Sequence, residues 1–328
     1  MSHLSVSLDD IETTSAAALT RHGANEKTAL SVAKAIRKAE ATGNLICGLY
    51  YLDSYCVQLG TGRVFGDVEP LVARPKGAVV TVDAKFGFAQ VAFDAGLPEA
   101  VKAAQEMGIA ALSIHHSHTC TSMGFFTEQI AQAGLIGIGM TNAPACVAPP
   151  GGSKPVLGTN PISMAVPDGK GGVAFSFDQS TSATAIGKVR VAASKDEQVP
   201  QGWIVDGAGN PTTEPKDMAS LVSSGGYKGF GFGLMAEILA GSLTGSVLSV
   251  EAAPLKTPEG PHHDLGQFYM LIDPSGYEGD LAASIVTLAQ AVESQPGARL
   301  PGRGKVLPRA VEIDSALWAS VQKLAGAL

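Results

Sequence analysis

The stretch that most constrains the fold lies at residues 112–128, LSIHHSHTCTSMGFFTE. The apolar run that leads into it, from Ile109 to Ile114, predicts a buried strand, and residues Met123 to Ala133 have the spacing of a helix. A strand that ends in polar residues just before a helix begins gathers backbone N–H groups and side-chain donors around one concave point. We expect a phosphate or a carboxylate to bind there.

Helices are predicted before this stretch, and an alternation of strands and helices around it. Helices are expected from Ser7 to Arg21, from Asn25 to Ala41, and over a third apolar stripe from Leu49 to Leu59. Strands are then expected at 68–73, 78–82, 109–114, 135–141, 173–178 and 268–272. Further helices are expected at 97–107, 123–133, 227–243, 281–292 and 316–328, and after the capping residues 179–182 as far as 194. The Pro- and Gly-rich segment 142–167 reads as an ordered loop, and the fold class indicated is α/β, or α+β, with a helical N-terminal part.

Composition excludes several classes of protein. The net charge of −7 over 328 residues and the lack of a basic run argue against nucleic acid as the main partner. No window approaches the ~20 apolar residues of a membrane span, and the N-terminus has neither the basic start nor the apolar core of a signal peptide. The four cysteines lack paired spacing, so we expect free thiols in a reducing, cytoplasmic compartment.

Two familiar nucleotide-binding motifs are absent. Gly137-Ile-Gly139 is followed by Met-Thr-Asn, so no Gly-x-Gly-x-x-Gly follows a strand, and no Gly-x4-Gly-Lys-Ser/Thr occurs. Lys228 follows Gly225-Gly226 at a predicted helix start, where the helix dipole disfavours a cation. Either an anion binds at this point or the lysine is simply solvated.

Three histidines raise the question of a metal. His116 and His118 can converge on one face of the strand, and His115 adjoins them. No carboxylate or second histidine pair lies nearby at ligand spacing, so no metal site is predicted. We therefore expect His115 and His116 to be structural histidines that form hydrogen bonds at the end of the strand.

Five motifs occur in the order of one known family. They are Ser117-His118 with its polar run, Gly158-Thr159-Asn160-Pro161-Ile162, Asp178-Gln179-Ser180-Thr181-Ser182, Gly225-Gly226-Tyr227-Lys228-Gly229 and Leu300-Pro301-Gly302. In these motifs, and over essentially its whole length, the chain resembles the malate/L-lactate dehydrogenase family. That family is unrelated to the Rossmann-type dehydrogenases and includes ureidoglycolate and sulfolactate dehydrogenases, diketogulonate reductase and Δ1-piperideine-2-carboxylate reductases.

The resemblance implies a homodimer with a non-Rossmann NAD(P)-binding fold, which takes NAD or NADP and a small carboxylate substrate. It implies a helical N-terminal part at 1–62 and an NAD(P)-binding domain at 118–287. A discontinuous core and dimerisation domain would comprise 63–117 and 288–328.

Carried over motif by motif, the resemblance also implies the site residues. The cofactor would contact Thr119, Cys120, Thr121, Ser122, Met123, Asp178, Gln179, Ser180, Tyr227, Lys228, Arg303 and Lys305. The substrate would contact Thr159, Tyr50 and His116, and His118 would face it. The choice between NAD and NADP stays open, with Lys188, Arg190, Arg303 and Lys305 as candidate partners of a 2′-phosphate.

The chain departs from the family where proton transfer is expected. Family members usually read Ser-His-Gly-x-x-Arg after the second helix, where Ser-His relay and donate a proton and Arg pairs with the substrate carboxylate. This chain reads Ile46-Cys47-Gly48-Leu49-Tyr50-Tyr51, and the third relay position falls on Ile186. Losing the acid costs on the order of 10²–10⁴-fold in ketone reduction. The catalytic candidates that remain are His118, Cys47 and Tyr51.

Three functions are consistent with these residues. The first is reduction of a small 2-oxo carboxylate, or oxidation of the 2-hydroxy acid, with His118 or a tyrosine as proton donor. The second is reduction of a cyclic 2-imino carboxylate, which brings its own proton. The third is a cofactor-binding protein with impaired catalysis.

Overall fold

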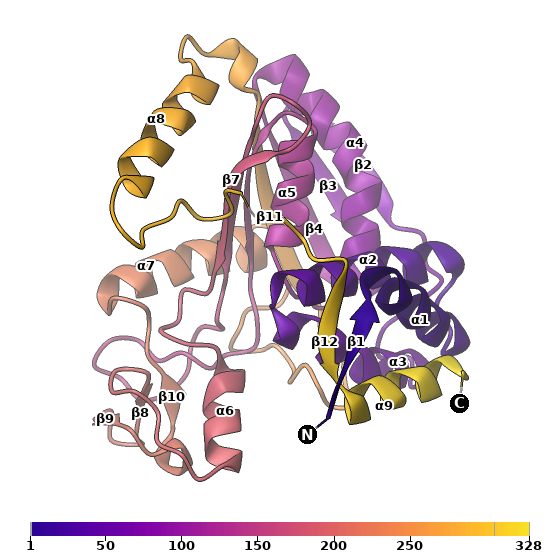
Figure 1. The fold of residues 1–328 in the computed structure, drawn as a ribbon, viewed down its shortest axis with the longest axis vertical. Helices are drawn as coiled ribbons and strands as arrows, with labels where there is room; N and C mark the ends of the chain where they lie inside the picture. Colours follow the sequence, from indigo (N-terminus) through magenta and orange to yellow (C-terminus); the bar gives the residue numbers. More distant parts are fainter. Residues whose placement is uncertain (1, 305, 328) are drawn as a thin grey trace.

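A seven-stranded sheet lies at the centre of the computed structural model, which describes residues 2–304 and 306–327 (Figure 1). The strand order is β2-β3-β4-β11-β5-β6-β7, and every neighbouring pair is antiparallel except the parallel pair β3 and β4. The strands are β2 (Leu71–Lys76), β3 (Val79–Asp83), β4 (Ile109–Ser117), β5 (Ile136–Thr141), β6 (Ile162–Pro167), β7 (Val173–Gln179) and β11 (Leu265–Ile272). The mixed α/β class predicted from the sequence is confirmed.

Helices cover both faces of this sheet. On one face α4 (Ala89–Met107) and α5 (Gly124–Gln132) meet where Phe93 packs against Phe126 and against Tyr269 of β11, at centroid distances of 4.9 and 5.0 Å. Gly266 of β11 points to the opposite face, where it lies against the π-helix η4 (Glu237–Ser242) that continues α7 (Tyr227–Ala236).

The two ends of the chain form a second unit beside the sheet. It contains α1 (Leu8–Arg21), α2 (Glu26–Thr42), the 3-10 turns η1 (Leu45–Cys47) and η2 (Leu49–Tyr51), α3 (Leu52–Gly60) and α9 (Ser315–Ala325). The predicted caps are present, because Ser7 and Asn25 accept backbone N–H groups of α1 and α2. β1 (His3–Ser7) pairs with β12 (Ala310–Asp314), so the first and last strands of the chain lie side by side (Figure 1).

A smaller lobe follows β7. It consists of α6 (Ile186–Ser194) and a three-stranded sheet of β8 (Ile204–Val205), β9 (Pro211–Thr212) and β10 (Ser220–Leu221). Short 3-10 turns lie at η3 (Pro215–Asp217) and η5 (Pro274–Gly276), and α8 (Leu281–Glu293) lies at the edge of the molecule (Figure 1).

Several expected elements differ from the structure. β6 lies inside the segment predicted to be a loop, since the Pro- and Gly-rich residues before it obscure its short apolar pattern. α4 begins at Ala89 rather than Leu97, because Ala92 and Phe93 are fully buried against the sheet and extend the helix before Pro98. β1 and β12 were not expected from the sequence. In the described part of the chain they pair only with each other, in a two-stranded sheet separate from the large one.

The predicted domain boundaries stay a prediction. Strands of 63–117 and of 118–287 hydrogen-bond within the one large sheet, and β12 and α9 pack against the helical N-terminal part. Among the described residues, no helix is both long and apolar enough to span a bilayer.

Candidate functional site

The motif of residues 178–182 meets the start of α5. Asp178 of β7 accepts hydrogen bonds from the Ser122 hydroxyl at 2.8 Å and from the Gly124 N–H at 2.9 Å. A carboxylate is stabilised at a helix N-terminus by the free N–H groups and the dipole. The helix start suggested by the sequence as a phosphate or carboxylate site is therefore occupied by a carboxylate of the protein itself.

The Gly-Thr-Asn motif lies against the same segment. The Thr159 carbonyl accepts from the Thr181 N–H at 3.0 Å and from the Ser180 hydroxyl at 3.0 Å. Asn160 is fully buried and donates to Glu237 at 2.7 Å, and a Cβ at Gly158 would lie 2.2 Å from the Ala143 carbonyl oxygen. Gly158 and Asn160 thus have structural reasons for their identity, whereas the role of the Thr159 side chain as a substrate contact stays a prediction.

The glycine-rich motif before α7 completes this cluster. The Ser224 N–H donates to the Thr181 carbonyl at 2.9 Å. Gly225 and Gly226 both have φ of +65°, a conformation that glycine adopts without strain. Apart from the adjacent residues of the chain, no described residue has an atom within 4 Å of a Cβ added at either. The loop therefore presents an open backbone beside the exposed Lys228 in the first turn of α7.

The last motif packs over β7. The Ser176 N–H donates to the Pro301 carbonyl at 3.3 Å, and Gly302 lies directly against Ser176. Arg303 is close to Glu293 of α8, with 3.4 Å between Nε and Oε1. Lys305, the other predicted contact of this loop, lies outside the described residues.

The remaining cofactor candidates have different surroundings. Cys120 and Met123 are buried in the core between the sheet and its helices, so only their backbone can reach a ligand. Thr119 is buried and its N–H donates to His263 at 3.3 Å. Thr121 has φ of +65°, and Gln179 and Tyr227 have exposed side chains.

The departure from the family pattern lies in the turn of η1 and η2. Buried Glu40 of α2 accepts the Leu49 N–H at 2.8 Å, and Gly48 lies so close to this carboxylate that a Cβ would be 2.1 Å from Oε1. The turn projects Ile46 towards α6, where its Cδ1 would be 2.9 Å from a Cβ at Gly187. Ile46, at one lost relay position, therefore lies against the residue that follows Ile186, the third relay position.

Cys47 and Tyr51 both hold their protons tightly. Burial, and then the charge of Asp178, raises the pKa of the Cys47 thiol to about 12. Burial also raises the pKa of Tyr51 to about 12, while the charge of Arg190 opposes the shift. Tyr51 stacks on buried Tyr55 with ring centroids 5.7 Å apart.

His118 is a buried neutral ring with 2% exposure. Its Nε2–H donates to Gln58 Oε1 at 2.8 Å, because the Gln58 amide nitrogen already donates to the carbonyls of Leu255 and Thr257. Its Nδ1 is buried and has no hydrogen-bond partner among the described residues, and burial holds the pKa of the ring well below its usual range. This environment does not favour the predicted proton-donor role, which stays a prediction.

Other residues of this region had no recognisable signal in the sequence. His263 stacks on His118 with centroids 3.9 Å apart. Arg63, 2% exposed, donates to the carbonyls of Pro254, Thr257 and Pro261 and so fixes the loop at 254–261. On that loop, Lys256 Nζ lies 3.6 Å from the centroid of the Tyr50 ring and 5.5 Å from that of Tyr51. A cation thus stands beside the position where the family arginine is lost.

His116 is bonded elsewhere. Its Nδ1 lies 2.8 Å from Asp264 Oδ1, and its ring packs on Phe86 at 5.1 Å. Within the described part of the chain, no contact links His116 to Tyr50, so its predicted substrate contact stays a prediction.

Comparisons with known proteins identify the family of this chain. The family model described as malate/L-lactate dehydrogenase matches residues 6–319. A Δ1-pyrroline-2-carboxylate reductase of Ancylobacter novellus is 35% identical over 314 residues, 92% of each chain. A (2R)-3-sulfolactate dehydrogenase (NADP(+)) of Chromohalobacter salexigens is 37% identical over 300 residues, 90% of this chain and 89% of that one. The solved structure of a Δ1-piperideine-2-carboxylate reductase from Pseudomonas syringae has a TM-score of 0.89 at 31% identity, covering 98% of this chain and 99% of that one.

Proposed function

The chain belongs to the malate/L-lactate dehydrogenase family of NAD(P)-dependent oxidoreductases, and from this premise we propose that it reduces a cyclic 2-imino carboxylate of the pyrroline or piperideine type. The 2-oxo carboxylates that the sequence puts first are the second candidate. Several relatives named as Δ1-pyrroline-2-carboxylate or Δ1-piperideine-2-carboxylate reductases support this order.

One observation carries the proposal: the residues at the family's proton-relay positions are either apolar or have a raised pKa and so do not readily give up a proton. Ile46 and Ile186 have no proton to give, and the pKa of the Cys47 thiol is about 12. Reduction of a ketone needs a proton for the developing alkoxide. A cyclic imine takes up a proton from water before it is reduced. Its reduction therefore needs no proton donor at the relay positions.

The cluster of motifs fits a dinucleotide. The open backbone of Gly225 and Gly226 and the exposed Lys228 suit a pyrophosphate, because its negative charge needs N–H donors and a cation close by. NADH or NADPH, when bound, supplies the hydride. Arg190 and Arg303 are candidate partners for a 2′-phosphate.

We assign the substrate carboxylate to Lys256. Arg63 and Gln58 hold the carbonyls on both sides of this lysine, so its loop is fixed before substrate arrives. Its ammonium group lies over the Tyr50 ring and near Tyr51, where it can replace the missing arginine as a positive charge.

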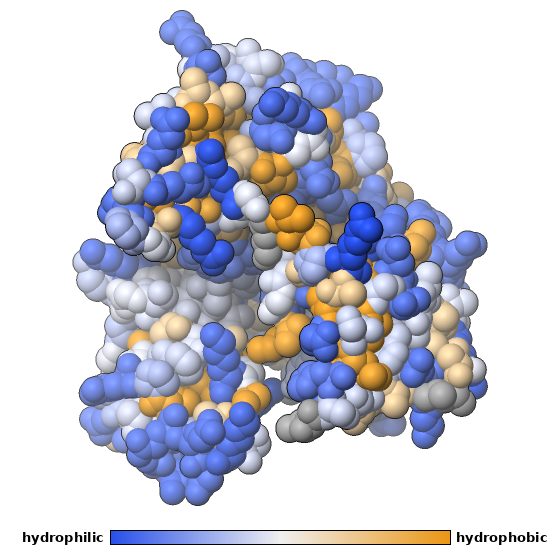
Figure 2. Space-filling view, in the orientation of Figure 1, coloured by the Kyte–Doolittle hydropathy of each residue, from blue (hydrophilic) through white to orange (hydrophobic). Residues whose placement is uncertain are grey.

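We also propose a homodimer in the cytoplasm. Exposed apolar side chains gather on α7, η4 and α8, and Figure 2 shows hydrophobic residues at the surface over α8. They include Tyr227, Phe232, Leu234, Ile238, Val286 and Leu288. Apolar patches of this kind mark association surfaces. The four cysteines are free, as a reducing compartment requires.

The test is oxidation of NADH and NADPH in parallel by the purified protein, with Δ1-pyrroline-2-carboxylate, Δ1-piperideine-2-carboxylate, sulfopyruvate and a panel of 2-oxo acids. Turnover confined to the cyclic imines is the expected result. Efficient turnover of a 2-oxo acid would move the second candidate, favoured by the sulfolactate dehydrogenase relative, to the front. Cofactor binding without turnover of any compound would support a protein with impaired catalysis.

A matched variant sharpens this test. Ile46→Ser combined with Cys47→His restores the first two relay positions in place. If the relay is what ketone reduction lacks, this double variant gains activity with 2-oxo acids by roughly tenfold or more while imine reduction changes little. No gain would show that the apolar relay does not set the substrate class.

A further inference from the structure

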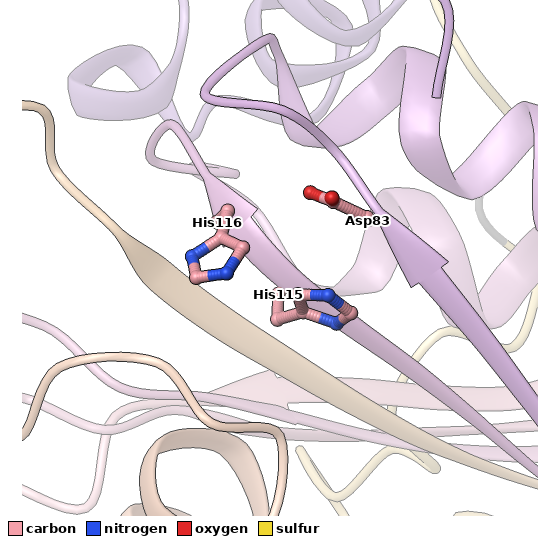
Figure 3. A group of neighbouring side chains, drawn as sticks. All are labelled: Asp83, His115 and His116. Carbon is pink, nitrogen blue, oxygen red and sulfur yellow. The ribbon is translucent and has the colours of Figure 1, made fainter. Parts of the chain in front are cut away.

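A second cluster of polar side chains lies at the edge of the large sheet. Asp83 ends β3, and His115 and His116 lie near the end of β4. One ligand atom from each of the three lies within 4.8 Å of the other two, and all three residues are partly buried. Figure 3 shows the carboxylate and the two rings as neighbours near the ends of β3 and β4.

The sheet explains how three residues of two strands converge. Parallel pairing of β3 and β4 places Asp83 directly opposite His115. Successive residues of a regular strand point to opposite faces, which would separate the two histidines. Instead, the pairing of β4 with β11 jumps from Ile114–Gln267 to Ser117–Leu265, so both histidines oppose a single residue. Such a bulge re-aims a side chain, and the two rings come within 4.8 Å, centroid to centroid.

A neighbouring carboxylate orients one of the rings. His116 Nδ1 lies 2.8 Å from Asp264 Oδ1, so this nitrogen carries the proton and Nε2 keeps a free lone pair. A histidine that binds a metal commonly donates its other N–H to a carboxylate in this way. His116 and Asp264 also have φ of +51° and +50°, conformations that non-glycine residues rarely adopt. The surrounding fold therefore holds this pair in place against backbone strain.

We propose that Asp83, His115 and His116 bind a divalent transition metal ion of the zinc class, with Asp264 as the residue that positions His116. Two imidazoles and one carboxylate suit zinc, cobalt or nickel, whereas calcium and magnesium prefer oxygen ligands. Three protein ligands leave one coordination position for water or a further ligand.

This site goes beyond the proposed reduction, and it differs from the sequence-based expectation of no metal, which the zinc titration below tests. The carboxylate comes from another strand, which the local spacing of the histidines could not indicate. It also gives His116 a different role from the predicted substrate contact.

Metal binding can be measured directly on the full chain after treatment with a chelator. Titration with ZnCl2 in a calorimeter should show one equivalent bound. Titration with Co²⁺ should give visible d–d bands without the thiolate charge-transfer absorption that the four free cysteines would produce. Because no substrate or cofactor is present, the result does not depend on the proposed reductase activity.

Variants locate the site. His115→Gln and Asp83→Asn should each weaken zinc binding by at least about tenfold, and Asp264→Asn by roughly 10–100-fold, as for other residues that support a metal ligand. His3→Gln, an exposed histidine of β1, is the matched control and should bind like the parent protein. Thermal unfolding in chelator checks that each variant is folded.

Three results would overturn the proposal. They are no zinc binding by the parent protein, binding that neither His115→Gln nor Asp83→Asn alters, and a cobalt spectrum dominated by thiolate absorption.

Discussion

Removing the charge of Lys256 tests how the substrate is held. Lys256→Met keeps the length of the side chain and its contact with the Tyr50 ring but removes the cation. The loop itself should stay in place, because Arg63 and Gln58 bind its main-chain carbonyls and not the lysine side chain.

The expected loss follows from the charge. A hydrogen bond to a charged group contributes about 1.5–3 kcal/mol, and each 1.36 kcal/mol corresponds to about a tenfold change in rate. Since Lys256 is exposed, the lower end applies, and we expect kcat/KM to fall roughly tenfold. Most of the fall should be in KM, because the carboxylate is bound equally in the substrate and in the transition state.

The assay is the steady-state oxidation of NADPH with Δ1-pyrroline-2-carboxylate. Lys256→Arg should retain most of the activity, and Lys170→Met, which removes an exposed lysine of a remote turn, should not change it. The same cyclic imine without its carboxylate should be reduced equally by Lys256→Met and by the parent protein. An equal loss on both imines, or kcat/KM within about twofold of the parent on the carboxylate, would refute the assignment.

Three further predictions concern the rest of the site. Cys47→Ala should leave imine reduction within a few-fold, measured as kcat, because a thiol with a pKa of about 12 is not needed as the acid. Burial lowers the pKa of the His263 ring from 6.5 to about 3, so between these two pH values the unfolded chain binds a proton that the folded chain does not. The free energy of unfolding, measured with urea, should therefore fall by up to about 1.4 kcal/mol per pH unit as the pH drops from 6.5 towards 3, and less steeply in His263→Gln. Gly229→Ala places a Cβ 2.0 Å from the Ser224 carbonyl oxygen and should weaken NADPH binding in a fluorescence titration. Gly231→Ala should not, because outside its own stretch of helix no described residue comes within 4 Å of the added Cβ.

A substantial part of the fold can be predicted from the sequence, because its helices and strands are marked by local residue patterns. Ser7 and Asn25 cap the helices that they were expected to begin, and Gly43 ends the second with φ of +76°. The apolar run at Ile109 is a buried strand, and a helix follows it at Gly124. Each of these features depends on residues within a few positions of one another, so periodicity and capping suffice to find them.

The candidate site can be predicted only in part, because many of its contacts join segments that are far apart in the sequence. The departure at Ile46 and Cys47 is visible in the sequence, since it depends only on the order of residues in a motif. The contact of Ile46 with α6 and the placement of Asp178 on the start of α5 depend on distant segments. Lys256 belongs to no recognisable motif. It becomes a candidate partner of the substrate carboxylate only because Arg63 fixes its loop beside Tyr50.

The sequence by itself determined the local elements, the order of the motifs and the loss of the relay residues. The tertiary structure decided which strands are neighbours, that β1 pairs with β12, and that Asp83 lies opposite His115. The alternation of apolar and polar residues that marks a strand lies within the strand itself. Which strand lies next to it depends on packing between segments far apart in the chain, and the local pattern does not specify that.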